Sequence, residues 1–207
     1  MSAVIYDVAL HPPGSARNCW SACAIMLLSW ARRHFADPQS MAVDKNFQAL
    51  YESGPVMKME QADKFLSAWG LVREHPMHHL PAGLLNLLNQ YGPLIVSSWT
   101  GPPGEPESGA VNHARLVTGF DPVAMVVSLN DPWSPNAMSF APKAAGFRLT
   151  MQYQLFVRMM NNLSAKAQGE SSGRLFIARL PVRPHQPRPV VPPKPVVSDT
   201  DGQEEKV

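Results

Sequence analysis

Residues 18–31 read NCWSACAIMLLSWA, in which a thiol at Cys19 is followed directly by an apolar run with the spacing and length of a helix. The Pro-Pro-Gly sequence at 12–14 interrupts regular structure, so we expect the helix to begin near residues 17–20 and to cover about 19–35. A helix N-terminus carries about half a positive charge and unpaired N–H groups, and both stabilise the nucleophilic thiolate. Cys19 is therefore a candidate nucleophile, although a cysteine beside an apolar helix more often belongs to the core.

Two later stretches carry a histidine and a carboxylate at the ends of expected strands. A strand over 113–120 begins at His113, and a strand over 124–129 is followed by Asp131 in an Asp-Pro turn. The residue before a proline is held extended, so the carboxylate is presented at the strand end. A nucleophilic thiol needs a base that accepts its proton, and the base needs a partner that orients it. Cys19, His113 and Asp131 supply these three roles in chain order.

Four stretches stand out in chain order: NCWSAC (18–23), YGPLIV (91–96), HARLVTGF (113–120) and NDPW (130–133). Together they resemble the papain-like cysteine peptidases, especially the compact bacterial branch that includes bacteriocin-leader peptidases and secreted effector proteases. The similarity covers about residues 12–180. It implies an α+β, papain-like fold in which an N-terminal helical part with the cysteine helix packs on an antiparallel sheet. It also implies that Cys19 is the nucleophile, His113 the base and Asp131 the residue that orients the histidine.

The oxyanion hole is the first departure from the family pattern. The family has a glutamine about six residues before the nucleophile, and this chain has Pro13, which lacks a donor. Losing one oxyanion donor costs on the order of 10²–10³ in rate. The backbone N–H of Cys19 remains. The candidates for the second donor and for support of the site are Asn18, His11, Ser15, Arg17 and Trp20.

Arg115 is the second departure, because the family has a small or aliphatic residue two places after the histidine. Strand alternation puts Arg115 on the same face as His113. Its guanidinium either binds an acidic group of the substrate or reaches solvent, and the solvent interpretation is the more common one for long basic side chains. Trp133, after the Asp-Pro turn, is a second candidate for substrate binding.

The composition argues against several other classes of function. The chain has 207 residues and a net charge of +2 with scattered Lys and Arg, so we expect no nucleic-acid partner. No apolar stretch reaches about 18 residues, so we expect no membrane span. Residues 1–7 lack the regions of a signal peptide. We therefore expect synthesis in the cytoplasm, with any secretion through a dedicated secretion system.

Only two cysteines are present, Cys19 and Cys23, four residues apart on one expected helix. This is poor geometry for a disulfide, and the spacing of Cys and His does not match a zinc site. We therefore expect no metal and no cofactor, and we assign Cys23 to the core.

The remaining pattern separates a catalytic domain from a tail. We expect helices over 60–69, 81–91 and 151–163, strands over 94–99 and 174–180, and a flap over 100–112. Helices first and strands afterwards indicate α+β. Residues 1–180 form the expected papain-like domain. Residues 181–207 are rich in proline and then acidic, which predicts a polyproline-like, disordered tail.

Three functions remain open from the sequence. The first is a cysteine hydrolase that cleaves peptide bonds in a protein or peptide substrate, as a bacterial toxin or effector with an inhibitor or immunity partner. The second is a catalytically impaired module that binds peptides, and the missing glutamine favours it. The third is a peptidoglycan amidase or a transglutaminase-type acyl transferase with the same triad, because the acceptor is chosen by the pocket rather than by the triad.

Overall fold

The computed structural model describes most of the expected domain. The described residues are 2–11, 19–32, 45–46, 49, 59–74, 80–99, 112–132, 146–166 and 177–181. Most of the expected flap over 100–112 and of the tail over 181–207 lies outside these ranges. Within them the fold is α+β, with helices packed on an antiparallel sheet, and it is consistent with the expected papain-like fold.

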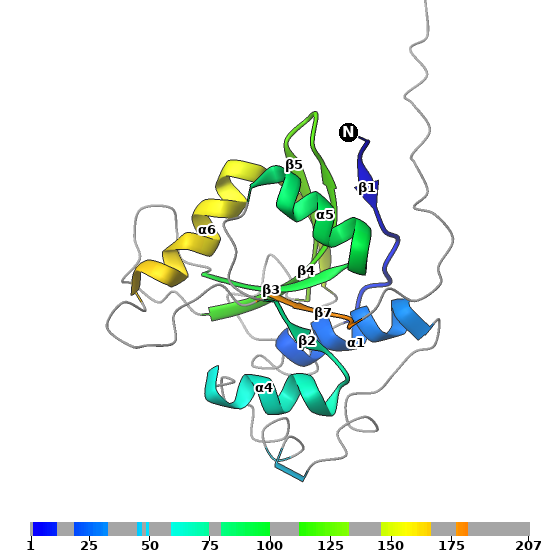
Figure 1. Cartoon of the computed structure of the whole chain (residues 1–207), viewed down its shortest axis with the longest axis vertical. Coiled ribbons are helices and arrows are strands. Elements are labelled where there is room, and N and C mark those ends of the chain that lie inside the picture. Colours follow the sequence, from blue (N-terminus) through cyan, green and yellow to red (C-terminus); the bar gives the residue numbers. More distant parts are fainter. Residues whose placement is uncertain are drawn as a thin grey trace, which may run out of the picture.

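The elements carry the labels of Figure 1. The helices are α1 (Cys19–Arg32), α4 (Met59–Ala68), α5 (Pro81–Tyr91) and α6 (Tyr153–Lys166). The strands are β1 (Val4–Ile5), β2 (Val72–Arg73), β3 (Leu94–Trp99), β4 (Asn112–Asp121), β5 (Val126–Asp131), β6 (Phe147–Gln152) and β7 (Ile177–Arg179). The predicted beginning of the cysteine helix and the bounds of α5 and β3 are confirmed.

The strands form one sheet in the order β2-β7-β3-β4-β5-β6, and every neighbouring pair is antiparallel. The N-terminal segment is extended, and β1 pairs with the second half of β4, past the end of β3. The Tyr6 hydroxyl also donates a hydrogen bond of 2.7 Å to the carbonyl of Leu88 in α5. The leading residues are therefore part of the folded core.

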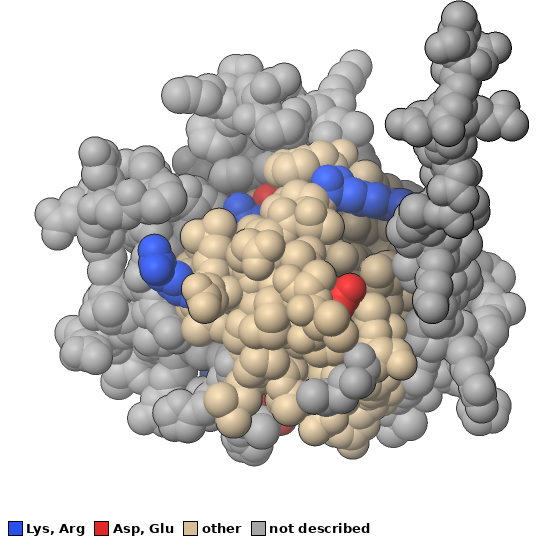
Figure 2. All heavy atoms as spheres, turned by 90° about the horizontal axis from the view of Figure 1, so that it is seen from above, with Lys and Arg blue, Asp and Glu red and all other residues tan. Residues whose placement is uncertain are grey.

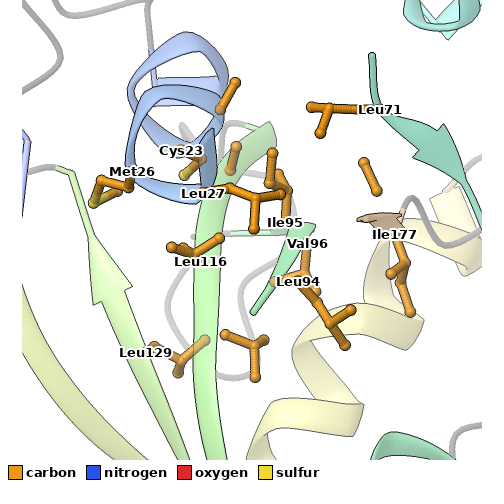
Figure 3. Close-up of a cluster of buried hydrophobic side chains, with 14 of the residues drawn as sticks. Cys23, Met26, Leu27, Leu71, Leu94, Ile95, Val96, Leu116, Leu129 and Ile177 are labelled. Carbon is orange, nitrogen blue, oxygen red and sulfur yellow. The ribbon is translucent and has the colours of Figure 1, made fainter. Parts of the chain in front are cut away.

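Helices cover both faces of the central strands. Helices α5 and α6 lie on one side of β3 and β4, and α1 lies on the other (Figure 1). Because β3 is covered twice, Leu94, Ile95 and Val96 are all buried, without the alternation of a half-exposed strand. Figure 3 shows Cys23 and Leu27 of α1 near Ile95, with Leu94 towards α6. Cys23 is thus a core residue, as predicted.

Strand β6 was not expected, and it corrects the predicted helix over 151–163. Residues 147–152 read FRLTMQ, an alternation of apolar and polar residues that is typical of a half-buried strand. Met151 and Gln152 pair with Val127 and Val126 of β5, so the helix begins only at Tyr153. Pairing with the sheet therefore overrides the local helical preference at these two residues.

The turn between β4 and β5 is longer than predicted. The Asp121 side chain accepts hydrogen bonds from the backbone N–H groups of Val123 at 2.8 Å and Ala124 at 3.0 Å. This Asx turn, with Met125 at a φ of 54°, holds the chain away from the ladder. Strand β5 consequently begins at Val126 rather than at 124, and it extends to Asp131.

Gly92 joins α5 to the sheet in a way that requires glycine. Its φ is +85°, and its N–H donates a hydrogen bond of 2.9 Å to the carbonyl of Leu88. A side chain at this position would also collide with the ring of Trp30 in α1. The glycine therefore ends the helix and leaves room for the Trp30 ring of α1 beside the turn that follows α5.

On the face in Figure 2, the Lys and Arg side chains lie at a few separate places, one of them beside an acidic side chain, and most of the described surface is uncharged. In the part of the chain that the structure describes, no helix has the length and hydropathy needed to cross a bilayer.

Candidate active site

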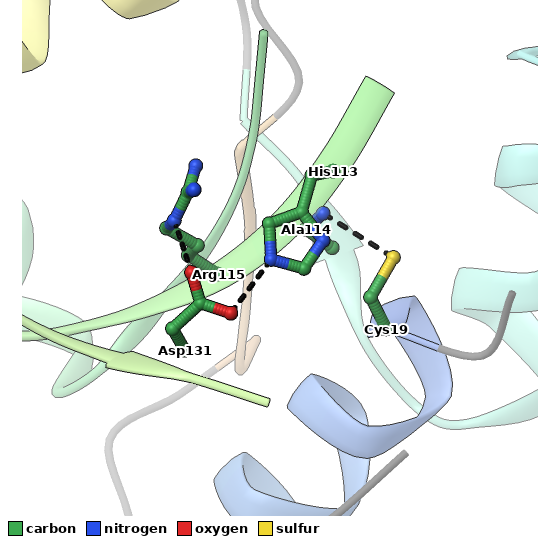
Figure 4. Close-up of polar contacts among 5 residues, drawn as sticks. All are labelled: Cys19, His113, Ala114, Arg115 and Asp131. Carbon is green, nitrogen blue, oxygen red and sulfur yellow. Dashed lines mark hydrogen bonds and ion pairs between the residues drawn. The ribbon is translucent and has the colours of Figure 1, made fainter. Parts of the chain in front are cut away.

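Cys19 is the first residue of α1, and its sulfur lies against β4. The backbone N–H of Ala114 donates a hydrogen bond of 3.4 Å to the Cys19 Sγ, across 95 positions of sequence (Figure 4). The sulfur thus meets a donor from the sheet as well as the positive end of the helix dipole. Both place partial positive charge beside the sulfur of the candidate nucleophile.

His113 lies between the cysteine and a carboxylate. Its Nε2 is 2.7 Å from the Asp131 Oδ1, and its side chain is fully buried. An ionised carboxylate only accepts hydrogen bonds, so Nε2 carries a proton. The other ring nitrogen, Nδ1, is on the side of Cys19 (Figure 4). The imidazole is therefore oriented by Asp131 and faces the thiol whose proton it would accept.

The surroundings favour the charged form of the imidazole. Burial by itself lowers the pKa of His113, but the hydrogen bond with Asp131, the neighbouring Cys19 side chain and the charges of both groups raise it above the ordinary value of 6.5. A raised pKa of His113 favours an imidazolium beside a thiolate, the charge state in which a Cys–His pair is nucleophilic.

For Cys23, the surroundings favour the neutral form instead of the charged form. It is fully buried, and burial first, then the nearby charge of Cys19, raise its pKa well above the ordinary value. The side chain therefore stays a neutral thiol in the core. Of the two cysteines, only Cys19 combines a helix N-terminus with a histidine neighbour.

Arg115 pairs with the second oxygen of Asp131. Its Nε donates a hydrogen bond of 2.6 Å to the Asp131 Oδ2, and its side chain is 12% exposed. The expectation that the guanidinium reaches solvent is therefore wrong. The reason is strand register: Leu116 is opposite Asn130, and continuing that register puts Arg115 opposite Asp131. A role of Arg115 towards the substrate stays a prediction.

A register shift in β4 decides which residues Asp131 meets. The pairing of β4 with β5 shifts by one residue between Val117 and Gly119. Without this shift, the pairing of Gly119 with Ser128 would continue to bring Leu116 opposite Asp131. A one-residue slip moves a side chain to the other face of the sheet. The irregularity therefore puts the carboxylate on the face of His113 and Arg115.

The other predicted site residues are less closely tied to this geometry. Trp20 is buried and packs edge-on against Phe65, with ring centroids 4.4 Å apart, and its indole N–H has no hydrogen-bond partner among the described residues. His11 is half-buried at the end of the first described segment, and its role stays a prediction. Asn18, Ser15, Arg17 and Trp133 lie outside the described residues.

Two contacts of the site were not predicted from the sequence. The N–H of Ala114 is a backbone donor, which no side-chain pattern reveals. Asn130, directly before the carboxylate, donates a hydrogen bond of 3.0 Å from its Nδ2 to the carbonyl of Val8. It thereby ties the end of β5 to the N-terminal segment, and this long-range contact has no local signal. Among the described residues, no group of three or more His, Cys, Asp or Glu could hold a metal ion.

The chain also resembles a known family of proteins. No curated protein matches the chain. A family model described as papain-like cysteine protease AvrRpt2 matches residues 2–145, which is more than half of the chain and includes Cys19, His113 and Asp131. The chain therefore belongs to the papain-like cysteine protease family AvrRpt2.

Proposed function

We propose that this chain hydrolyses peptide bonds with Cys19 as nucleophile, His113 as general base and acid, and Asp131 as the residue that orients the histidine. One observation carries the proposal: the buried imidazole is held by Asp131 at 2.7 Å on one side and faces Cys19 on the other. The family match supports a cysteine peptidase in general.

The geometry suggests the order of proton transfers. His113 takes the thiol proton, and the Cys19 sulfur attacks the carbonyl carbon of the substrate. The tetrahedral intermediate collapses as His113 returns the proton to the leaving amine, which leaves a thioester on Cys19. His113 then takes a proton from water, the hydroxide attacks the thioester, and the acid and the free thiol are released. Throughout, Asp131 keeps Nε2 protonated and the ring in place.

The beginning of α1 supports stabilisation of the oxyanion. The N–H groups of the first helical turn have no acceptor within the helix, and the helix dipole favours negative charge there. The N–H of Cys19 belongs to this turn. We therefore propose it as one oxyanion donor, with a second donor from the segment before the helix, where Asn18 and His11 are the candidates.

Peptide cleavage can be tested without knowing the natural substrate. The full chain is incubated with a peptide library from a digested proteome, and mass spectrometry records new termini. We expect cleavage by the wild type and none by Cys19→Ala. Cys23→Ala is the matched control, because this thiol lies one turn further along the same helix and should not be needed. Equal cleavage by wild type and Cys19→Ala would overturn the proposal.

The same experiment separates the alternatives. A mass change of about one dalton or a cross-link, lost in Cys19→Ala, would replace hydrolysis by deamidation or acyl transfer. Peptides retained on the wild type without any change of mass would indicate a binding module instead. Cleavage of cell-wall muropeptides, but not of the library, would indicate a peptidoglycan amidase.

We also propose that the chain acts as a secreted effector, with proteins of another cell as substrates. Its membership in a papain-like protease family supports a protein substrate. Expression in a host cytoplasm and in a bacterial periplasm, each with Cys19→Ala as control, tests this. Toxicity of the wild type only in the periplasm would contradict it and favour a wall substrate, and toxicity in neither compartment would also contradict it.

A further inference from the structure

We propose that Arg115 is a positioning residue for this reaction: it acts through Asp131 and fixes the carboxylate that orients His113. The inference rests on the proposed function, because it assigns Arg115 a part in the chemistry of Cys19 and His113. It differs from the sequence-based expectation, in which Arg115 bound substrate or reached solvent.

The two oxygens of the carboxylate have different partners. The Asp131 Oδ1 is 2.7 Å from the Nε2 of His113, and the Oδ2 is 2.6 Å from the Nε of Arg115 (Figure 4). The terminal torsion of an aspartate is soft, so a carboxylate held at one oxygen can turn about its last bond. Held at both oxygens by charge-assisted hydrogen bonds, it cannot turn without losing one of them. Arg115 therefore fixes the direction of the contact with His113.

The charges of the four groups alternate when the site is active. A Cys19 thiolate, a His113 imidazolium, an Asp131 carboxylate and the Arg115 guanidinium carry charges of opposite sign in sequence, and they sum to zero. The Asp131 side chain is only 4% exposed, and a buried charge is costly unless it is paired. Without Arg115, the same three groups would hold a net negative charge, and the carboxylate would take up a proton more readily.

Three neighbouring elements pack around Asp131, and two of them contribute titratable groups. Helix α1 contributes Cys19 and Cys23, and burial keeps the latter neutral. Strand β4 contributes His113 and Arg115. In β6, the residue opposite Asp131 is Phe147, and its neighbour Arg148 binds Asp7 and the carbonyl of Val8 instead. Among the described residues, Arg115 therefore supplies the permanent positive charge at this carboxylate.

A second ion pair in the same sheet provides a matched control. The Arg179 Nε binds the Glu74 carboxylate, with side chains 14% and 12% exposed, so its burial is similar. The pair joins β7 to Glu74, which directly follows β2. Continuing the register of β7 with β3 puts Arg179 opposite Leu94, the first residue of β3, whereas His113 is opposite Ser98 near the other end of that strand. Arg179→Met removes a comparable buried cation without touching the site.

The pH dependence of Cys19 alkylation tests the inference without any substrate. The full chain reacts with iodoacetamide between about pH 4 and 9, and mass spectrometry follows the peptide that contains Cys19. Arg115→Met should move the acid limb of the rate profile to higher pH, so that the rate near pH 6 falls about tenfold. Arg115→Lys, which keeps the charge but not the planar fork, should restore part of the rate. Arg179→Met should reproduce the wild-type profile.

A double-mutant cycle shows whether Arg115 acts through Asp131. Asp131→Asn should slow alkylation, and Arg115→Met should cause no further loss in that background. Losses that multiply, or an Arg115→Met profile with the wild-type midpoint, would overturn the inference. Each variant is first shown to be folded at the assay temperature by its melting curve.

His113→Gln separates failure of this inference from failure of the proposed function. If His113→Gln changes the alkylation profile but Arg115→Met does not, only the role of Arg115 fails. If wild type and His113→Gln react alike, as an ordinary thiol does, the Cys–His pair itself fails.

Discussion

Two buried arginine–carboxylate pairs in the same sheet have different consequences. Arg115 binds Asp131 at the end of β5, and Arg179 binds Glu74 at the edge formed by β2 and β7. In both pairs the arginine Nε contacts one carboxylate oxygen, and all four side chains are largely buried. The difference lies in the third partner. The other oxygen of Asp131 holds His113, whereas the guanidinium of Arg179 lies 3.7 Å from the ring centroid of Tyr91.

A buried arginine–carboxylate pair by itself does not make a functional site. At the edge, the ion pair packs against the ring of Tyr91, and among the described residues neither partner contacts a histidine or a cysteine. At the end of β5, the same kind of pair holds an imidazole that faces a thiol at a helix N-terminus. The chemistry comes from the elements that meet there, and the ion pair holds them in register.

Catalysis should depend strongly on the carboxylate of Asp131 and hardly at all on that of Glu74. On a peptide found to be cleaved, Asp131→Asn should lower kcat/KM by roughly 10²–10⁴, because the imidazole loses the acceptor that fixes its tautomer. Glu74→Gln should change it by less than about twofold. Steady-state kinetics on folded protein measures both, and a comparable loss in Glu74→Gln would show that Asp131 acts only through stability.

The two buried pairs should contribute similarly to the free energy of unfolding. Removing one partner of a buried ion pair leaves a buried charge, which typically costs about 3–5 kcal/mol of unfolding free energy. Arg115→Met and Arg179→Met should both approach the lower end of that range, with a slightly larger loss for Arg179 because its contact with Tyr91 is also lost. Urea unfolding measures each loss. If Arg179→Met were as stable as the wild type, the two pairs would not contribute similarly to stability.

The stability contributed at the site of Asp131 should vary with pH, because His113 titrates there. The pKa of His113 is raised in the folded chain, so the folded state binds this proton more tightly than the unfolded state. The resulting stability is full below the ordinary value of 6.5 and is lost as the pH rises through the raised value. The difference in unfolding free energy between wild type and His113→Gln should therefore shrink from pH 6 to 9.

The edge pair provides the control for this pH dependence. It contains no imidazole, so the difference between wild type and Glu74→Gln should stay constant over the same range. Urea unfolding at several pH values measures both differences. A difference for His113→Gln that does not vary with pH would show that the proton contributes nothing to folding.

The smallest effect concerns a third pair, on the surface. Arg148 is 2.9 Å from Asp7, but these side chains are 60% and 85% exposed. Exposed pairs contribute little because water and salt screen them, so Asp7→Asn should change the unfolding free energy by less than about 0.5 kcal/mol. Unfolding at low and high salt measures this. A loss as large as that of Arg179→Met would show that burial does not govern these pairs.

The first helix and the central strands could be predicted because their signals are local. A Pro-Pro-Gly break followed by an apolar run predicts a helix that begins at Cys19, and the structure confirms it. Proline at the beginning of α5 and glycine after its end bound that helix to the residue. Strand β6 was missed although its alternation is visible, because the helical pattern after it was extended two residues too far.

The order of Cys19, His113 and Asp131 and the elements that carry them can be deduced from the chain without coordinates, because helix ends, turns and strand periodicity depend on near neighbours. Three features of the site follow from the folded arrangement instead: a register shift in β4 turns Asp131 towards His113, the second oxygen of Asp131 binds Arg115, and a backbone N–H of β4 contacts the sulfur. Strand alternation fixes which residues share a face within one strand. Which face a residue of the neighbouring strand shares depends on the pairing register, and a shift of one residue moves its side chain to the other face. Packing between distant parts of the chain sets that register.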